Sequence, residues 1–268
     1  MSPDRRGRAG RRAPFLDERG VSDVVGYVLV FALVTATITS VFAIGMGGIE
    51  DRRDAERVEN VERAFEVFDD NVRDLERYGD PSRATEVRLS GGELSLSSKT
   101  NVTVEQVHNG TRVSENVTRA NSSAVTYTRG ETTIGYDMGA RFRTDGNTTL
   151  FRSEPRFVSA ENGSNRTVIT VVRTRSGDGP ETATGEGTVQ ISASVGEVRR
   201  FEFPEENVGP YDIRVRIDSS RANAWGRYLN GTDRFANVST GTDEVVATVK
   251  HDETVYVRVI VVDVSYRR

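Results

Sequence analysis

The chain has 268 residues, of which 36% are hydrophobic and 28% charged, the composition of a folded protein of one or two domains rather than of a disordered chain. Residues 1–20 hold six arginines and three acidic residues, which leaves 30 basic against 37 acidic side chains in the rest. This mildly acidic body argues against nucleic acid as a partner, and the absence of cysteine excludes disulfides, thiolate metal sites and thiol nucleophiles.

The first long element is a segment without charged side chains, residues 24–49. At about 1.5 Å per residue, a helix of this length spans roughly 39 Å, more than the roughly 30 Å hydrocarbon core of a membrane. The run is longer than the apolar region of a secretory signal, so we expect a transmembrane helix over residues 21–49. The positive-inside rule then predicts a cytoplasmic N-terminus and an extracellular C-terminal part, because six arginines precede the span: Arg5, Arg6, Arg8, Arg11, Arg12 and Arg19.

A basic leader, a small residue and a short polar patch stand directly before this helix, in the run Arg19-Gly20-Val21-Ser22-Asp23. A protease at the membrane face needs an extended, flexible bond, which Gly20 favours. The run resembles archaeal type IV pilin-like precursors. The resemblance implies that prepilin peptidase removes a leader of residues 1–20, and that the helix anchors the mature chain in the lipid membrane and packs with other pilin-like subunits.

Two features of this segment leave alternatives open. Asp23 stands where many archaeal pilins carry proline, which leaves filament assembly open. An uncut signal-anchor helix with an Arg-rich tail would show the same hydropathy and the same charge asymmetry, and would hold a binding module that does not assemble.

Residues 50–80 are predicted to form an amphipathic stalk helix with one narrow apolar stripe. Gly79 and Pro81 follow its last periodic residue, so we expect a single helix over residues 22–78, unless the glycines at 45, 47 and 48 bend it. The stripe can dock on the following domain or pair with other copies, and its two and a half heptads favour docking. Its residues are spaced by three and four: Val58, Val61, Phe65, Phe68, Val72 and Leu75.

From residue 84 to residue 268 the apolar period changes to two, and glycine, asparagine and aspartate mark the turns. This predicts a mainly antiparallel, β-sandwich-like domain and an α+β fold. One helix is expected over residues 220–229, with Ser219 or Ser220 as its cap and Trp225 as a core or cover residue. Strands are expected at residues 85–89, 93–97, 101–107, 124–128, 132–137, 141–143, 148–152, 167–174, 188–195, 197–203, 211–217, 244–249 and 254–264.

Parts of the stalk and of the β-domain look similar to uncharacterised haloarchaeal pilin-like surface proteins. The segments concerned include Arg63-Ala64-Phe65-Glu66-Val67 and Tyr136-Asp137-Met138-Gly139-Ala140. The resemblance implies a location at the cell surface and a type of precursor, and it brings no known reaction.

Nine Asn-x-Ser/Thr sequons occur, all in the part of the chain that we expect outside the cell. Chance would give about two or three in a chain with this content of Asn, Ser and Thr. Turn-rich β proteins also bring these residues together, which explains part of the excess. We expect glycans at several of them: Asn101, Asn109, Asn116, Asn121, Asn147, Asn162, Asn165, Asn230 and Asn237.

No motif of a hydrolase, a nucleotide-binding loop or a metal centre is present in the sequence. The two histidines, His108 and His251, stand among turn residues. The carboxylates at 137, 145, 178, 205 and 206 lack the alternating spacing of a calcium loop. We therefore expect no cofactor, no metal and no catalytic residues, and we weigh a pilin-like structural or adhesive subunit against an anchored binding module and an ectoenzyme.

Overall fold

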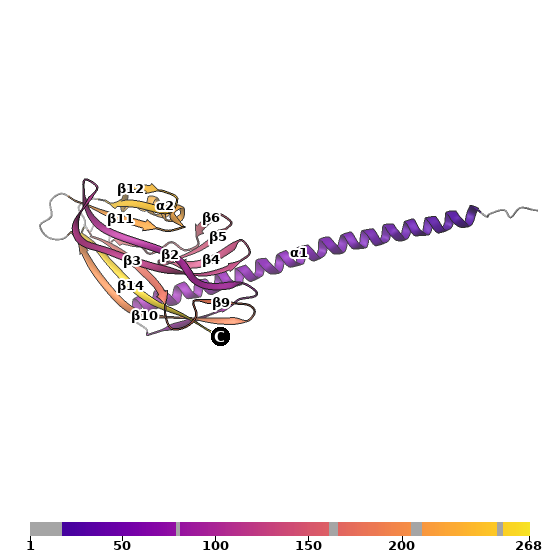
Figure 1. Ribbon diagram of the computed structural model, residues 1–268, viewed down its shortest axis with the longest axis horizontal. Coiled ribbons are helices and arrows are strands. Elements are labelled where there is room, and N and C mark those ends of the chain that lie inside the picture. The colour runs from indigo at the N-terminus through magenta and orange to yellow at the C-terminus, as the bar shows by residue number, and fades with distance from the viewer. Residues whose placement is uncertain (1–17, 79–80, 161–165, 205–210, 251–253) are drawn as a thin grey trace, which may run out of the picture. The chain divides into compact units, whose positions relative to one another are not determined.

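The computed structural model describes residues 18–78, 81–160, 166–204, 211–250 and 254–268. The chain divides into two compact units, Met1–Glu56 and Arg57–Arg268. Helix α1, Glu18–Tyr78, has residues in both units and is helical through the three glycines between residues 45 and 48 (Figure 1). The predicted single helix is therefore confirmed, and it begins four residues earlier than expected.

The second unit contains the C-terminal part of α1 together with all the strands. We expected a boundary near residue 80, between a stalk and a β-domain, and this compact unit extends across it. The reason is the apolar stripe: five of its six residues are at most 3% exposed, and they pack against strands of both sheets. The expectation that the stripe docks on the β-domain is confirmed.

The smaller sheet has five strands in the order β1-β10-β14-β8-β7. All its neighbouring pairs are antiparallel except β14 and β8, which run parallel over eleven residue pairs. Its strands are β1 (Arg83–Arg88), β10 (Thr188–Phe203), β14 (Thr254–Arg267), β8 (Arg166–Ser176) and β7 (Val158–Ala160).

The larger sheet has nine strands in the order β12-β13-β11-β2-β3-β4-β5-β6, with β9 paired to the start of β2. Every pair in it is antiparallel. Its strands are β2 (Glu93–His108), β3 (Thr111–Arg129), β4 (Thr132–Asp137), β5 (Ala140–Asp145), β6 (Thr148–Phe151), β9 (Thr182–Thr184), β11 (Asp212–Asp218), β12 (Phe235–Thr240) and β13 (Glu244–Val249).

Strand β14 contributes side chains to two separate cores. Val255, Val257 and Val259 belong to a core that also contains residues of β2, β11, β13 and helix α2. Ile260 and Val262 belong to the core around the stripe of α1. Because successive side chains of a strand point to opposite faces, the smaller sheet is covered on both faces. This explains why four hydrophobic residues, 259–262, follow one another where the buried face of β14 changes, whereas burial alternates in the rest of the strand.

The prediction of a mainly antiparallel α+β fold is confirmed. Both sheets are curled, as Figure 1 shows, and α1 rather than a second sheet supplies the centre of one core, so the sandwich arrangement is not confirmed. Helix α2 is Ala222–Gly231 and Trp225 is fully buried in the other core, as predicted. The expected serine cap is wrong: Arg221 is the N-cap residue, and the Ser219 hydroxyl accepts the Arg221 N–H at 3.2 Å instead.

Candidate functional site

The first half of α1, Asp23–Met46, is long and apolar enough to cross a membrane. None of its residues is buried, and its large apolar side chains are 47–78% exposed. Monomeric soluble proteins rarely expose apolar surface of this extent, which marks a contact with a membrane or with other proteins. We call this segment the apolar half of α1, and residues 57–78 the docked half.

Three hydroxyl groups within the apolar half are satisfied by the helix itself. Thr37 donates to the carbonyl of Val34, and Thr39 to that of Thr35, each at 2.8 Å. Ser40 donates to the carbonyl of Ala36 at the same distance. Such back-bonding removes unpaired polar groups from the helix surface, as a lipid environment requires.

The predicted processing segment lies in the first turns of α1. The helix begins at Glu18, so Arg19, Gly20 and Val21 are helical rather than extended, and only the backbone of residues 18–22 is described. Asp23, at the start of the apolar half, is exposed. A protease acting between residues 20 and 21 would have to unwind this first turn.

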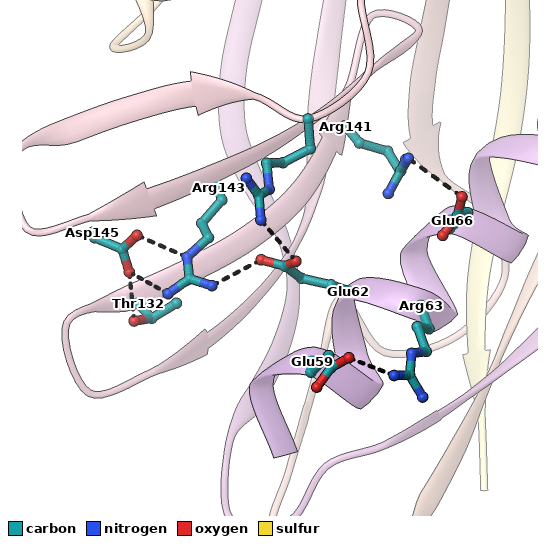
Figure 2. Close-up of polar contacts among 9 residues, drawn as sticks. Glu59, Glu62, Arg63, Glu66, Thr132, Arg141, Arg143 and Asp145 are labelled. Carbon is teal, nitrogen blue, oxygen red and sulfur yellow. Dashed lines mark hydrogen bonds and ion pairs between the residues drawn. The ribbon is translucent and has the colours of Figure 1, made fainter. Parts of the chain in front are cut away.

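A network of charged residues attaches the docked half to strand β5 and to the segment that follows β6 (Figure 2). Glu62 accepts from Arg143 at 2.9 Å and from Arg152 at 3.2 Å. Asp145 accepts two further hydrogen bonds from the same guanidinium, from Nε at 2.7 Å and from Nη2 at 3.0 Å. These hydrogen bonds from Arg143 lower the pKa of Asp145 and fix the position of the guanidinium between helix and strand.

About two turns further along the helix, a buried carboxylate continues this network. Asp69 is 2% exposed and lies 2.7 Å from Arg73 on the same helix. Ser153 donates to it at 3.2 Å, and Arg141 of β5 lies 3.6 Å away. Burial raises the pKa of Asp69, although Arg73 opposes the shift. Together with Glu62, Asp69 fixes which side of α1 faces the strands.

Asp137, one of the carboxylates considered for calcium, belongs to a buried ion pair. Its Oδ2 lies 2.6 Å from Arg221 and accepts from Thr100 at 2.6 Å. The Arg221 guanidinium also lies 4.5 Å from the centre of the Phe142 ring. Removal of one partner would leave a buried charge, so this cluster is a structural link between β2, β4 and the start of α2.

Seven of the nine sequons lie in the described residues, and Asn162 and Asn165 lie outside them. Asn101 is half-buried on β2, and only the backbone of Asn116 on β3 is described. The exposed acceptors are Asn109 in the β2–β3 turn, Asn121 on β3, Asn147 in the β5–β6 turn, Asn230 on α2 and Asn237 on β12. All seven lie on the larger sheet, in its turns or on α2, which packs against it.

The histidines do not form a site in the described part of the chain. His108 is exposed at the end of β2, as expected for a turn, and His251 lies outside the described residues. The described residues contain no group of three or more His, Cys, Asp or Glu side chains that could hold a metal ion.

The comparisons with known proteins give a family and no function. Neither the curated proteins nor the solved structures contain a match to this chain. A family model described as a family of unknown function, DUF7289, matches residues 19–265. The match includes the apolar half of α1, the docked half and both sheets. The chain therefore belongs to the DUF7289 family.

Proposed function

We propose that this protein is a non-enzymatic, glycosylated surface protein of the type IV pilin-like class, anchored in the membrane by the apolar half of α1. In this proposal the N-terminus lies in the cytoplasm and the Arg57–Arg268 unit lies outside the cell. The observation that carries it is the contrast within α1: the apolar half is exposed on all sides, whereas the stripe of the docked half is buried.

The burial of the stripe bears on how copies of the protein would assemble. Phe65, Phe68 and Val72 are at most 1% exposed within their own domain, so they have no surface left for a coiled coil with another copy. Assembly, where it occurs, would then use the apolar half, as the helices of pilin-like subunits do. The structural role we propose therefore concerns Asp23–Met46 and not residues 58–75.

Two further observations support the proposal. The family match covers residues 19–265 and therefore includes the apolar half. Five sequon asparagines are exposed on strands and turns of the larger sheet and on α2, which packs against it. A glycan at these positions would add solubility without displacing core residues.

N-terminal sequencing of the protein extracted from membranes tests the processing. We expect the mature chain to begin at Val21. Gly20→Val should leave the leader attached, because a β-branched residue then occupies the last leader position. Gly26→Val is the matched control, since a Cβ at Gly26 meets nothing within 4 Å, and this variant should be processed normally.

The alternative is a signal-anchored binding module that does not assemble. It predicts that the wild-type chain keeps residues 1–20 and stays spread in the membrane. Retention of the leader in the wild type would overturn the pilin-like part of the proposal and leave the anchoring in place.

Glycosylation is tested by removing single acceptors. Asn121→Gln and Asn147→Gln should each lower the mass of the protein by one glycan, whereas Asn60→Gln, an exposed asparagine outside any sequon, should not. Unchanged masses in variants of all five exposed acceptors would contradict the glycan part of the proposal.

A further inference from the structure

An open cavity of about 590 Å³ lies beside the C-terminal end of α1, within the Arg57–Arg268 unit. Five arginines and one carboxylate line it: Arg73, Glu76, Arg77, Arg156, Arg200 and Arg258. They come from α1, the β6–β7 connection, β10 and β14. With Glu76 ionised, the side chains of the cavity still carry a net charge of +4.

The arginines of the cavity are poorly neutralised by the protein. Arg73 pairs with Asp69 at 2.7 Å and with Asp70 at 3.3 Å. Among the described residues, no carboxylate lies within 4.0 Å of the other four arginines. Four guanidinium groups in one cavity without carboxylate partners repel one another, and an anion between them would relieve that repulsion.

The shortage of hydrogen-bond acceptors in the cavity is clearest at Arg258. It lies on β14 and is partly buried, and its Nη2 donates to the backbone carbonyl of Glu76 at 3.3 Å. Its Nε is buried and has no hydrogen-bond partner among the described residues, and the same holds for Nε of Arg73. A buried donor without a partner is destabilising, so these groups are expected to take an acceptor from a ligand.

Glu76 is a weak counter-charge for this cluster. Burial raises its pKa to about 7, against the opposing effect of Arg258 and Arg156. Near neutral pH the carboxyl is therefore protonated in a large fraction of molecules. The negative end of the helix dipole explains why cations gather at the end of α1, but half a unit charge does not balance five arginines.

A second cavity of about 570 Å³ adjoins the first, since Glu76, Arg156 and Arg258 line both. Hydroxyl-bearing side chains face it from β7, from β8 and from the C-terminal cap of α2, Tyr228 supplies an aromatic ring, and Glu154 adds a second carboxylate. Hydroxyl groups next to an aromatic ring and a cationic end are the side-chain chemistry that suits a sugar carrying a charged group. The hydroxyls belong to Ser159, Thr170 and Thr232.

We propose that the two adjoining cavities form a binding site for an anionic saccharide. Its oxyanion, a carboxylate, sulfate or phosphate, would lie against Arg156, Arg200 and Arg258. Its hydroxyl groups would lie along Ser159, Thr170 and Thr232. The site belongs to the Arg57–Arg268 unit alone, so its presence does not depend on the anchoring or the processing proposed above.

The test is an isothermal titration of the full chain in detergent, in a buffer of low ionic strength, with glucuronate, glucose 6-phosphate, inorganic sulfate and neutral glucose. We expect the two charged sugars to bind and glucose not to bind. Weaker binding of sulfate than of the charged sugars would support the sugar part of the site. Equal binding of all three anions would reduce the proposal to an oxyanion site and overturn the saccharide part.

Charge-matched variants locate the site. Arg156→Gln with Arg200→Gln should weaken binding at least tenfold, because each lost charge-assisted hydrogen bond contributes about 1.5–3 kcal/mol. Arg88→Gln with Arg119→Gln changes the net charge equally at exposed positions on β1 and β3 and should leave the affinity unchanged. Both arginines of the first pair are exposed, so the fold should be kept, which the fluorescence of the buried Trp225 reports.

Glu76→Gln is expected to raise the affinity rather than lower it, so its effect cannot be explained by misfolding of the variant. At pH 8, where the carboxyl is mostly ionised, its removal should strengthen binding several-fold. Absence of binding to any of the anions, or equal weakening by the two double variants, would overturn the proposal.

Discussion

The two halves of helix α1 differ both in their content of apolar residues, 17 of 24 in the apolar half against 9 of 22 in the docked half, and in how those residues are placed. In the apolar half they surround the helix, and all of them are exposed. In the docked half they form one stripe spaced by three and four, and charged residues occupy the other faces. A stripe can be buried by one domain, whereas a helix that is apolar on all sides needs a surrounding of lipid or of other helices.

This difference shows that both the number and the arrangement of apolar residues change along one continuous helix. In the docked half, Glu62 and Asp69 pair with arginines of β5 and of the segment after β6, so only one rotation of this half satisfies them. Residues 24–46 contain no charged side chain and therefore no pairing of this kind. The predictions below test this contrast, beginning with the largest expected effect.

Phe68→Ala should lower the free energy of unfolding of the Arg57–Arg268 unit by about 3–5 kcal/mol, the usual cost of deleting a buried phenylalanine side chain. Phe68 is 1% exposed and packs edge-on against Tyr136 at 5.3 Å. Phe42→Ala, in the apolar half where Phe42 is 68% exposed, is the matched control and should leave that free energy unchanged. Urea unfolding followed by the fluorescence of Trp225 measures the free energy of unfolding of both variants. Equal losses would contradict the difference in burial between the two halves of α1.

Val34→Arg should impair membrane insertion, because arginine at the centre of a membrane helix costs about 2.5–3.5 kcal/mol. The matched control is Val67→Arg, on the outward side of the docked half, where the side chain is 52% exposed. Fractionation of membranes after alkaline extraction should show loss of the first variant from the membrane and full retention of the second. Retention of both would contradict the role of the apolar half as an anchor.

Stability of the Arg57–Arg268 unit should fall as the pH rises from about 4.5 to about 7. The folded state raises the pKa of Glu76 from 4.5 to about 7, mainly through burial, so the folded state binds more protons than the unfolded state in this range. The stabilisation is present below the unfolded pKa and is lost as the pH rises through the folded pKa, and it amounts to at most about 3 kcal/mol. Urea unfolding at pH 5 and pH 8 measures it, and Glu76→Gln should remove most of the difference.

Glu62→Gln should cost about 1 kcal/mol, since it weakens two partly buried ion pairs between α1 and the strands. Glu59→Gln removes an exposed pair with Arg63 on the same helix and should cost no more than about 0.5 kcal/mol (Figure 2). Urea unfolding at low and high salt distinguishes them. A loss for Glu59→Gln as large as that for Glu62→Gln would show that these contacts do not orient the docked half.

Periodicity predicted the elements whose apolar residues follow one pattern. The stripe of α1 and the period-two strands β4, β11 and β13 were found within one or two residues of their ends. Strands β2 and β10 were each predicted as two, because a change of register interrupts the alternation near Leu96 and at Gly196. Gly196 lies at this shift, within the continuous strand β10, and a Cβ there would lie 2.5 Å from Asp263 Oδ2.

The elements that were missed lack such a pattern. The first part of β3, residues 111–123, is polar and contains two sequons, and it is a strand because it pairs with β2. β7, β9 and β12 are short or irregular. The arginine-lined cavity was also missed, because its side chains come from four parts of the chain more than forty residues apart. Only the fold brings them together, and no spacing along the sequence records it.

The place of β14 in the smaller sheet has a consequence for how the chain is made. β14 lies between β10 and β8, yet it follows both of them in the sequence. During synthesis, the stripe of α1 is made almost two hundred residues before Ile260 and Val262, which cover it in the folded protein. Until then this part of its core is incomplete. Chains that stop before residue 254 would leave β8 and β10 without their common neighbour, and with open edges that invite aggregation.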